Sequence, residues 1–310
     1  MSDVQRRQMT TVDAPNVFNI AIEGSFDDCQ DIVKALFADT KFRDDVQMSA
    51  VNSINWARVL AQVVYYAHAA SQLHAKTGSK VTFCVPTGNF GNVYAGYVAR
   101  AMGAPIDRLI VATNSNDILH RFFDTGRMQA EKVTPTLSPS MDIQISSNFE
   151  RLMFDLLDRN GEQVESLLQG FRKTGELQFG AEVRKKAQAI FASGRQDDAE
   201  TLDVMRRMYA ERKYLVDPHT AVGLGVAESY LVNEAYEGEG RSLVVSLATA
   251  HPAKFPDAVK QATGVMPELP PHLADLHDRK ERFTVLPNDV ARVKDFVKAN
   301  AGQGKSAIRA

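Results

Sequence analysis

The stretch VTFCVPTGNFGNVYAG, residues 81–96, decides the fold. Five residues of strand character, Val81–Val85, enter a turn that runs from Pro86 to Asn92, and a helix-compatible run follows from Val93. A strand that leads through a Gly-rich turn into a helix directs backbone N–H groups, and the positive end of the helix dipole, at one spot beyond the strand. That spot suits a phosphate. The alternative is a tight turn that binds no ligand.

The residue types of this turn fit an anion. Glycine adopts positive φ and lets a ligand approach the backbone, and asparagine tolerates the left-handed region and adds an amide donor. The turn is neither a G-x-G-x-x-G fingerprint nor a P-loop, because no Gly-Lys-Ser/Thr follows. It therefore favours a phosphorylated small molecule or cofactor over a nucleoside triphosphate.

Composition narrows the class of protein. The 310 residues are 44% hydrophobic and 24% charged, which is typical of a globular chain with one large domain or two. A formal net charge of −2 argues against nucleic acid as a partner. Cys29 and Cys84 lie in apolar runs without metal-ligand spacing, which indicates free thiols in a reducing compartment. No apolar run is long enough to cross a membrane, so we expect a cytoplasmic protein.

The order of predicted elements indicates an α/β protein with a mostly parallel sheet. A nearly all-apolar helix over 54–75 precedes the 81–85 strand, and a helix and a second strand, 108–113, follow it. A further buried strand is predicted over 241–249. Between them, residues 148–214 show repeated amphipathic segments, which predict a helical insert covering the sheet.

Four polar loops lie at predicted strand ends or helix starts, and a parallel sheet would gather them at one edge. They are Asn52–Ser53, Thr87–Asn92, Asn114–Asp117 and Thr249–His251. Arg58 follows Asn52 by about a turn and a half of helix, so Asn, Ser and a guanidinium there would hold a second phosphate. In the alternative, Asn52 and Ser53 only cap the helix and Arg58 pairs with a surface carboxylate. The histidines show no metal-ligand spacing, and no G-x-S-x-G elbow supports a hydrolase.

Seven blocks, taken together and in this order, resemble the threonine synthase family of the long bacterial and fungal type. They are SDVQRRQMTTVDAPNVFNIAIEGSFDDCQ, VNSINWARVLAQVVYY, VPTGNFGNVYAGY, ATNSNDILHRFFDTG, PSMDIQISSNFERL, DPHTAVG and LATAHPAKF. The resemblance covers almost the whole chain. It implies a pyridoxal-phosphate enzyme of fold type II, the tryptophan-synthase-β-like fold, with a remainder of a small N-terminal domain over 1–52. It also implies a large domain over 53–310 that contains the mainly helical insert at about 145–215.

The resemblance also implies roles for single residues. Gly88, Asn89, Phe90, Gly91 and Asn92 correspond to the loop that holds the cofactor phosphate. Thr249 corresponds to the hydroxyl that meets the pyridine nitrogen, and a neutral partner there tunes the ring as an electron sink. Asn52, Ser53 and Arg58 correspond to the substrate-phosphate contacts, and the block from Asp217 to Gly223 only shapes the pocket. No metal is implied.

The implied reaction converts O-phospho-L-homoserine and water to L-threonine and phosphate, the last step of threonine biosynthesis, by a monomeric enzyme. One departure stands out, because the Schiff-base lysine of the family lies in an HGPT-x-x-FKD-like run that residues 1–310 do not contain. Four lysines precede the Gly-rich turn outside such a motif and are expected on the surface: Lys34, Lys41, Lys76 and Lys80. We therefore expect an N-terminally truncated chain with little or no turnover.

Two other interpretations stay open. Another enzyme of the same fold, such as a threonine dehydratase or a tryptophan-synthase-β-like protein, would act on substrates without the phosphate that Asn52, Ser53 and Arg58 are expected to bind. A non-catalytic protein that binds a phosphorylated ligand would use the same turn. The same interpretation includes an unstable fragment that persists only with a partner supplying the missing segment.

Overall fold

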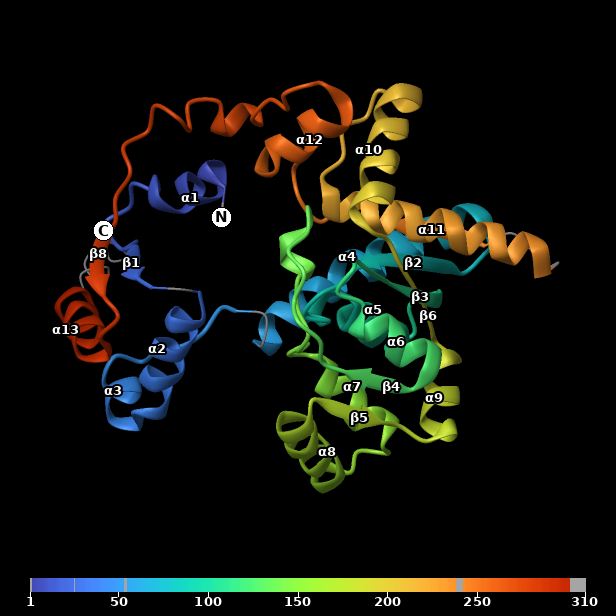
Figure 1. Ribbon diagram of the computed structural model, residues 1–310, viewed down its shortest axis with the longest axis horizontal. Helices are drawn as coiled ribbons and strands as arrows, with labels where there is room; N and C mark the ends of the chain where they lie inside the picture. Colours follow the sequence, from blue (N-terminus) through green and yellow to red (C-terminus); the bar gives the residue numbers. More distant parts are fainter. Residues whose placement is uncertain (1, 25, 53–54, 238–241, 302–310) are drawn as a thin grey trace. The chain divides into compact units, whose positions relative to one another are not determined.

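The computed structural model describes residues 2–24, 26–52, 55–237 and 242–301. The chain forms two compact units, one of residues 1–50 with 268–310 and one of residues 51–267 (Figure 1). Within the described ranges, no helix combines the length and the apolar character that a membrane crossing requires.

The larger unit is built on a parallel sheet with strand order β6-β3-β2-β7. Its central strand β2 (Val81–Pro86) is the predicted strand extended by one residue. It pairs in parallel with β3 (Ile106–Thr113) on one side and with β7 (Leu243–Ser246) on the other. β6 (Phe191–Arg195) continues the sheet beyond β3. The predicted α/β class with a parallel sheet is confirmed.

Alternate residues of the strands pack against opposite layers of helices. Phe83 and Leu109 face a large core with residues of α4 (Trp56–Thr77), α5 (Gly91–Ala101) and α6 (Ile118–Thr125). Cys84 and Ile110 pack with residues of α11 (Pro218–Glu237) on the other side. Because both faces of the sheet are covered, β2 is buried along its whole length.

The predicted helical insert is only partly correct. Helices do dominate this region: α7 (Phe149–Leu156), α8 (Gly161–Thr174), α9 (Ala181–Gln188) and α10 (Asp198–Arg212). However, the segment also supplies the edge strand β6, whose sequence FASGR carries little β propensity. β5 (Glu176–Gln178) also lies in this segment and forms a separate antiparallel pair with β4 (Arg127–Gln129). The segment is therefore part of the sheet and not simply a cover for it.

The smaller unit joins the two ends of the chain. β1 (Ile20–Glu23) pairs in parallel with β8 (Thr284–Pro287), and a core of Ile32, Leu36, Phe42 and Val293 lies under this pair. Its helices are α1 (Asp3–Thr10), α2 (Phe26–Ala38), α3 (Thr40–Asp45) and α13 (Val290–Asn300). Residues 268–301 thus belong with the N-terminal segment and not with the large domain, where the sequence analysis placed them. The β1–β8 pairing causes this difference, and the short β8 was not predicted.

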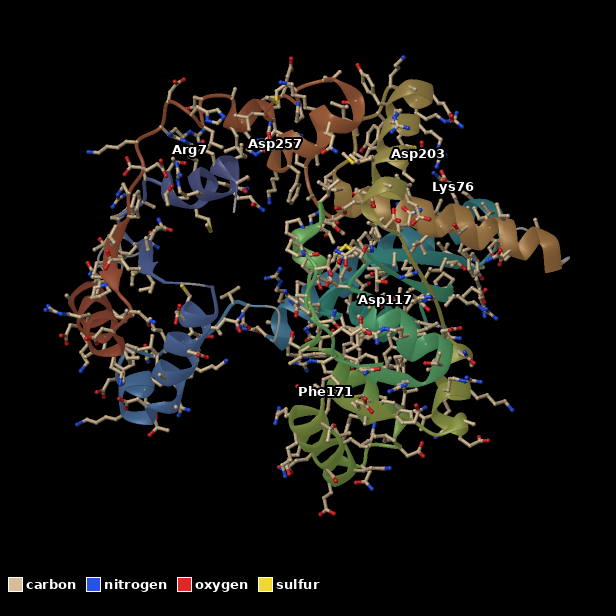
Figure 2. The ribbon with its side chains drawn as sticks, viewed as in Figure 1. Arg7, Lys76, Asp117, Phe171, Asp203 and Asp257 are labelled. Carbon is tan, nitrogen blue, oxygen red and sulfur yellow. The ribbon has the colours of Figure 1, made fainter. Side chains whose placement is uncertain are left out.

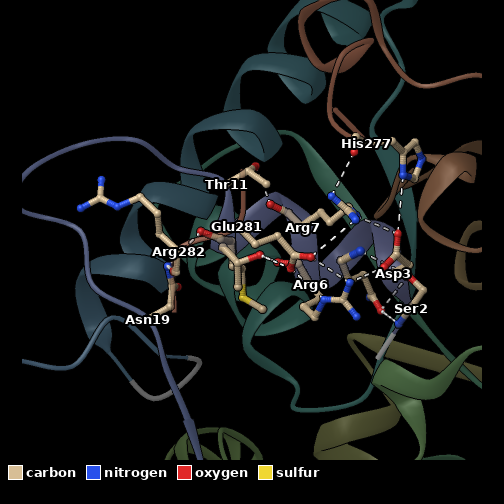
Figure 3. A network of polar contacts seen from close by, with 12 residues as sticks. Ser2, Asp3, Arg6, Arg7, Thr11, Asn19, His277, Glu281 and Arg282 are labelled. Atoms are coloured by element: carbon tan, nitrogen blue, oxygen red, sulfur yellow. Dashed lines mark hydrogen bonds and ion pairs between the residues drawn. The ribbon is translucent and has the colours of Figure 1, made fainter. Parts of the chain in front are cut away.

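A network of charged side chains ties α1 to the segment before β8 (Figure 3). The guanidinium of Arg6 donates to Glu281 through Nε at 2.9 Å and Nη2 at 3.0 Å, and the hydroxyl of Thr10 donates to the same carboxylate at 2.8 Å. These donors lower the pKa of Glu281 from 4.5 to about 2, the Arg6 hydrogen bond having the largest effect. Glu281 is therefore the carboxylate through which α1 is hydrogen-bonded to the segment before β8.

Gly96 lets α5 approach its neighbours, so we predict that Gly96→Ala destabilises the larger unit by about 1–3 kcal/mol. An added Cβ would lie 2.8 Å from Leu109 Cδ2 and 2.9 Å from the buried ring of Tyr66. Urea unfolding measures the change. Gly170→Ala, at an exposed helical position with no atom within 4 Å of the new Cβ, should instead stabilise by ~0.5–1 kcal/mol. Equal effects of the two substitutions would contradict the packing argument.

The Glu281 contact should depend on pH. Because its folded pKa is lowered, its contribution to stability is complete above about pH 4.5 and is lost as pH falls toward 2. An NMR titration of the Glu281 carboxyl should give a midpoint near 2, and Arg6→Ala should raise it toward 4.5. Arg279→Ala, which removes a partner of Asp275 instead, should leave the midpoint unchanged. A midpoint near 4.5 in the unmodified chain would show that this hydrogen bond is not formed.

Candidate active site

The predicted anion site lies in a pocket at the carboxyl end of β2. The cavity has a volume of about 290 Å³, at the lower end of the ~300–1,000 Å³ typical of small-molecule sites. Its walls come from α4, the turn before α5, the 3₁₀ helix η1 (Pro139–Met141), the start of α11 and the loop after β7. The lining residues are Arg58, Val59, Gln62, Pro86, Thr87, Gly88, Asn89, Phe90, Gly91, Asn92, Ser140, Met141, His219, Thr249 and Ala250. Among these lining residues there is an arginine but no carboxylate.

The turn owes its shape to Phe90 and not to a glycine. Phe90 is the N-cap of α5 and has φ 62° and ψ −6°, the left-handed conformation, whereas neither Gly88 nor Gly91 has positive φ. The prediction that glycine supplies the positive φ is therefore wrong. Gly88 is needed for space instead, because a Cβ there would lie 2.6 Å from the backbone oxygen of Ser140.

Packing of the Phe90 ring offsets the strain of its backbone. A non-glycine residue in the left-handed region costs about 1–2 kcal/mol. The ring is 1% exposed and meets Phe149 edge-on at 5.3 Å between centroids, with Phe191 at 6.0 Å. Burying an aromatic side chain contributes about 1.5–3 kcal/mol, which is enough to hold the strained turn. The left-handed residue is thus locked by the core beneath it.

The turn presents donors to the pocket because its carbonyls are bound elsewhere. The oxygen of Gly88 accepts from Ser146 Oγ at 2.9 Å, and that of Asn89 accepts from Asn148 Nδ2 at 2.9 Å. Among the described residues, no acceptor meets the backbone N–H groups of residues 88–92. Successive unpaired N–H groups at a helix N-terminus form a concave anion site. The turn therefore offers the N–H donors that the predicted phosphate cradle would need.

Asn92 extends this row of donors. Its Oδ1 accepts from the hydroxyls of Tyr65 at 2.5 Å and Tyr66 at 2.9 Å, which leaves its Nδ2 donor for the pocket. Burial raises the pKa of Tyr65 to about 12 and that of Tyr66 well above 10, so both hydroxyls keep their protons near neutral pH. The orientation of the Asn92 amide is consequently fixed by α4.

The predicted substrate-phosphate residues divide into three cases. Arg58 lines the pocket from the exposed first turns of α4, and no carboxylate partner for it is found in the described ranges. Asn52 is described and exposed but is not among the lining residues. Ser53 lies outside the described residues. The helix cap is Asn55, whose side chain accepts from Ala57 N at 2.8 Å, and not Asn52. Asn55 is the same type of cap residue as Asn52, and it lies directly before the first helical residue, Trp56.

Thr249 lines the opposite part of the pocket. Its backbone N–H donates to Thr220 Oγ1 at 3.2 Å, and its own hydroxyl has no partner within the part of the chain that the structure describes. A second hollow of about 420 Å³, along β7, shares Gln62, Asn92 and Thr249 with the first. The site therefore extends beyond the turn, toward the edge of the sheet.

The loop from Asn114 to Asp117 does not line the pocket, although it was expected among the ligand-binding loops. Asn114 Nδ2 donates to Asp142 Oδ1 at 2.8 Å, and Asn116 Nδ2 donates to the same atom at 3.0 Å. Asp117, which is labelled in Figure 2, forms ion pairs with Arg121 and Arg195. The loop is instead hydrogen-bonded to Asp142, directly after η1. It therefore contributes to the pocket indirectly, by positioning η1. No cluster of three potential metal ligands occurs among the described residues.

Sequence reasoning missed several pocket residues. Ser140 and Met141 belong to a Pro- and Ser-rich connection whose composition indicates only a loop. His219 falls in the block that was expected only to shape the pocket, and no role of its own was assigned to it; it is buried and lines the cavity. Its place in DPHTAVG, directly before a nearly apolar helix, was the one available sign of a buried role.

Comparison with protein families shows to which family the chain belongs. A model described as pyridoxal-phosphate dependent enzyme matches residues 1–168, more than half of the chain. A model described as threonine synthase, C-terminal, matches residues 220–297. The chain belongs to the pyridoxal-phosphate dependent enzyme family. Its cofactor is accordingly pyridoxal phosphate, and the predicted resemblance to threonine synthases is confirmed.

Individual relatives agree with this assignment. The threonine synthase of Pseudomonas aeruginosa is 52% identical over 98% of this chain and 64% of that protein. That of Saccharomyces cerevisiae is 40% identical over 98% of this chain and 63% of that protein. The crystal structure of a PLP-bound threonine synthase from Brucella melitensis, 47% identical, superposes with a TM-score of 0.90 over 97% of this chain and 63% of that one. The chain thus spans a little under two thirds of these relatives, and the expected fold type II is confirmed.

The residues of the pocket fit the phosphate ester of this cofactor. The unpaired N–H groups of residues 88–92 supply donors, Gly88 leaves the backbone accessible, and no carboxylate among the described lining residues opposes an anion. Thr249 offers a neutral hydroxyl elsewhere in the same cavity. The pocket can therefore hold both ends of pyridoxal phosphate.

We predict that Gly88→Ala weakens binding of pyridoxal phosphate about tenfold or more, because the new methyl group and the Ser140 oxygen cannot occupy the same space. Fluorescence titration measures the dissociation constant. Gly180→Ala serves as the control, since its Cβ would meet no atom within 4 Å. Unchanged affinity in Gly88→Ala would mean that the cofactor does not depend on this turn.

Proposed function

We propose that this chain serves the reaction that converts O-phospho-L-homoserine and water to L-threonine and phosphate. One observation carries the proposal: the cradle of unpaired N–H groups and the guanidinium of Arg58 line the same pocket. A cofactor phosphate and a substrate phosphate each require cationic or N–H donors, and this pocket has two such groups of donors. The similarity to threonine synthases along 98% of the chain supports the same substrate.

The residues of the chain contribute position and electrostatics. Residues 88–92 hold the cofactor phosphate, and the Thr249 hydroxyl meets the pyridine nitrogen without a charge. When bound, pyridoxal phosphate supplies an electron sink for carbanions of the substrate. Arg58, which lines the pocket, binds the phosphate that departs, and a cation at that place stabilises the negative charge of the leaving group.

We further propose that none of the lysines within residues 1–310 anchors the cofactor covalently. The four lysines considered in the sequence, Lys34, Lys41, Lys76 and Lys80, are all exposed. Among the described residues that line the pocket, none is a lysine. Covalent anchoring and proton transfer in this chemistry need an amine near the ring, so this chain alone should turn over little substrate.

Reduction with borohydride tests this second proposal. The chain mixed with pyridoxal phosphate should bind it reversibly, and after reduction, peptide mass spectrometry should find no single lysine that carries the cofactor. Reduction of free lysine under the same conditions gives the background. A stoichiometric adduct on one lysine would overturn the claim and identify the anchoring residue.

Arg58→Ala should weaken binding of inorganic phosphate and O-phospho-L-homoserine to the cofactor-loaded chain by about threefold to thirtyfold, as expected for loss of a charge-assisted hydrogen bond. Homoserine, which lacks the phosphate, should bind equally to both forms. Arg100→Ala removes an arginine on α5 outside the pocket lining and is the matched control. If homoserine lost affinity as well, Arg58 would have a general role and not a phosphate role. Tight binding of unphosphorylated serine or threonine would favour a dehydratase-like enzyme.

We also propose that the protein works as a monomer in the cytoplasm. Cys29 and Cys84 are both free thiols, which suits a reducing compartment. Burial raises the pKa of the Cys84 thiol, whose Sγ donates to the Gly223 carbonyl, so this cysteine is inert.

A further inference from the structure

Behind the pocket, at the start of α11, lies a carboxylate that the proposed reaction does not use. Asp217 is fully buried, and its partners are the two residues that follow Pro218. Oδ1 accepts from the backbone N–H of His219 and from His219 Nδ1, both at 2.9 Å, and Oδ2 accepts from the hydroxyl of Thr220. A buried carboxylate with several donors is held in one orientation.

One chain of hydrogen bonds leads from Asp217 to the phosphate end of the pocket. Ser140 N–H donates to His219 Nε2 at 3.2 Å, so Nε2 carries the lone pair and the ring proton is on Nδ1, facing Asp217. The backbone oxygen of the same Ser140 is the atom that a Cβ on Gly88 would meet. His219 thereby supports η1 against the back of the phosphate turn.

A second chain leads from Asp217 to the ring end. The Thr220 hydroxyl gives its one proton to Asp217 Oδ2, so its oxygen is left to accept from Thr249 N–H, at 3.2 Å. His219 and Thr220 are themselves buried, at 4% and 5% exposure, whereas Ser140 and Thr249 are exposed where they line the pocket. In both chains, the donor and the acceptor of every hydrogen bond are thus defined. Both chains end on residues that line the pocket.

We propose that Asp217 is a positioning residue that sets the two ends of the ligand site independently, the phosphate turn through His219 and Ser140 and the ring contact through Thr220 and Thr249. The residues from Asp217 to Thr220 thus do more than shape the pocket. One hydrogen-bonded arm, through His219, leads to the phosphate turn, and the other, through Thr220, leads to the ring contact. It relies on the proposed function only for the identity of the ligand.

Amide hydrogen exchange in the ligand-free chain tests the two arms separately. Thr220→Val removes the hydroxyl at nearly constant volume, so exchange of the Thr249 amide should become about threefold to tenfold faster while that of Ser140 is unchanged. Thr220→Ser keeps the hydroxyl and should restore the slow exchange. His219→Phe keeps a ring beside Phe255, 4.7 Å away between centroids, and should speed exchange at Ser140 only.

The loaded chain gives a second readout. With pyridoxal phosphate bound, Thr220→Val should shift the ¹⁵N resonance of the pyridine nitrogen and leave the ³¹P resonance in place, whereas His219→Phe should do the reverse. If either substitution changed both ends equally, or if Thr220→Ser failed to restore Thr249, the two-arm proposal would be wrong. A chain that binds no pyridoxal phosphate would instead refute the proposed function, and the exchange experiment would still decide whether the His219 and Thr220 arms act separately.

Discussion

The left-handed backbone of Phe90 is the constraint on which the site depends. A turn from β2 into α5 needs one residue with positive φ, and here a phenylalanine adopts it while its ring is buried among other aromatic rings. The strain of the turn is thus balanced by the core of the larger unit. As a result, backbone N–H groups face the cavity as a property of the folded sheet, before any ligand binds.

The remaining pocket residues are placed by buried hydrogen bonds around this turn. Ser146 and Asn148 donate to the carbonyls of the turn. Tyr65 and Tyr66 donate to the Asn92 side chain. Asp217 accepts from His219 and Thr220 at the start of α11. Arg58 is the exception, because it is exposed and has no carboxylate partner in the described ranges. A buried, hydrogen-bonded cradle for a resident cofactor and an exposed cation for a substrate that comes and goes are compatible with one pocket.

Much of this arrangement could be predicted from the sequence, and the exceptions have physical causes. The strand, turn and helix of residues 81–101 were evident because apolar runs and turn residues agree locally. The residue with positive φ was not evident. Phe90 adopts this conformation, and its glycine neighbours do not, because its ring packs against aromatic residues that are distant in sequence. β6 and β8 were missed because each is short and pairs with a strand remote in sequence. The roles of Ser140 and His219 likewise depend on contacts between segments that are 79 residues apart.

If the turn held by Phe90 binds a phosphate through its main chain, its amide groups must respond to that phosphate. The most direct test is a titration of ¹⁵N-labelled chain with pyridoxal phosphate and, separately, with pyridoxal. The amide protons of residues 88–92 should move downfield with pyridoxal phosphate and hardly move with pyridoxal. Equal shifts with both compounds, or shifts confined to other residues, would contradict this mode of binding.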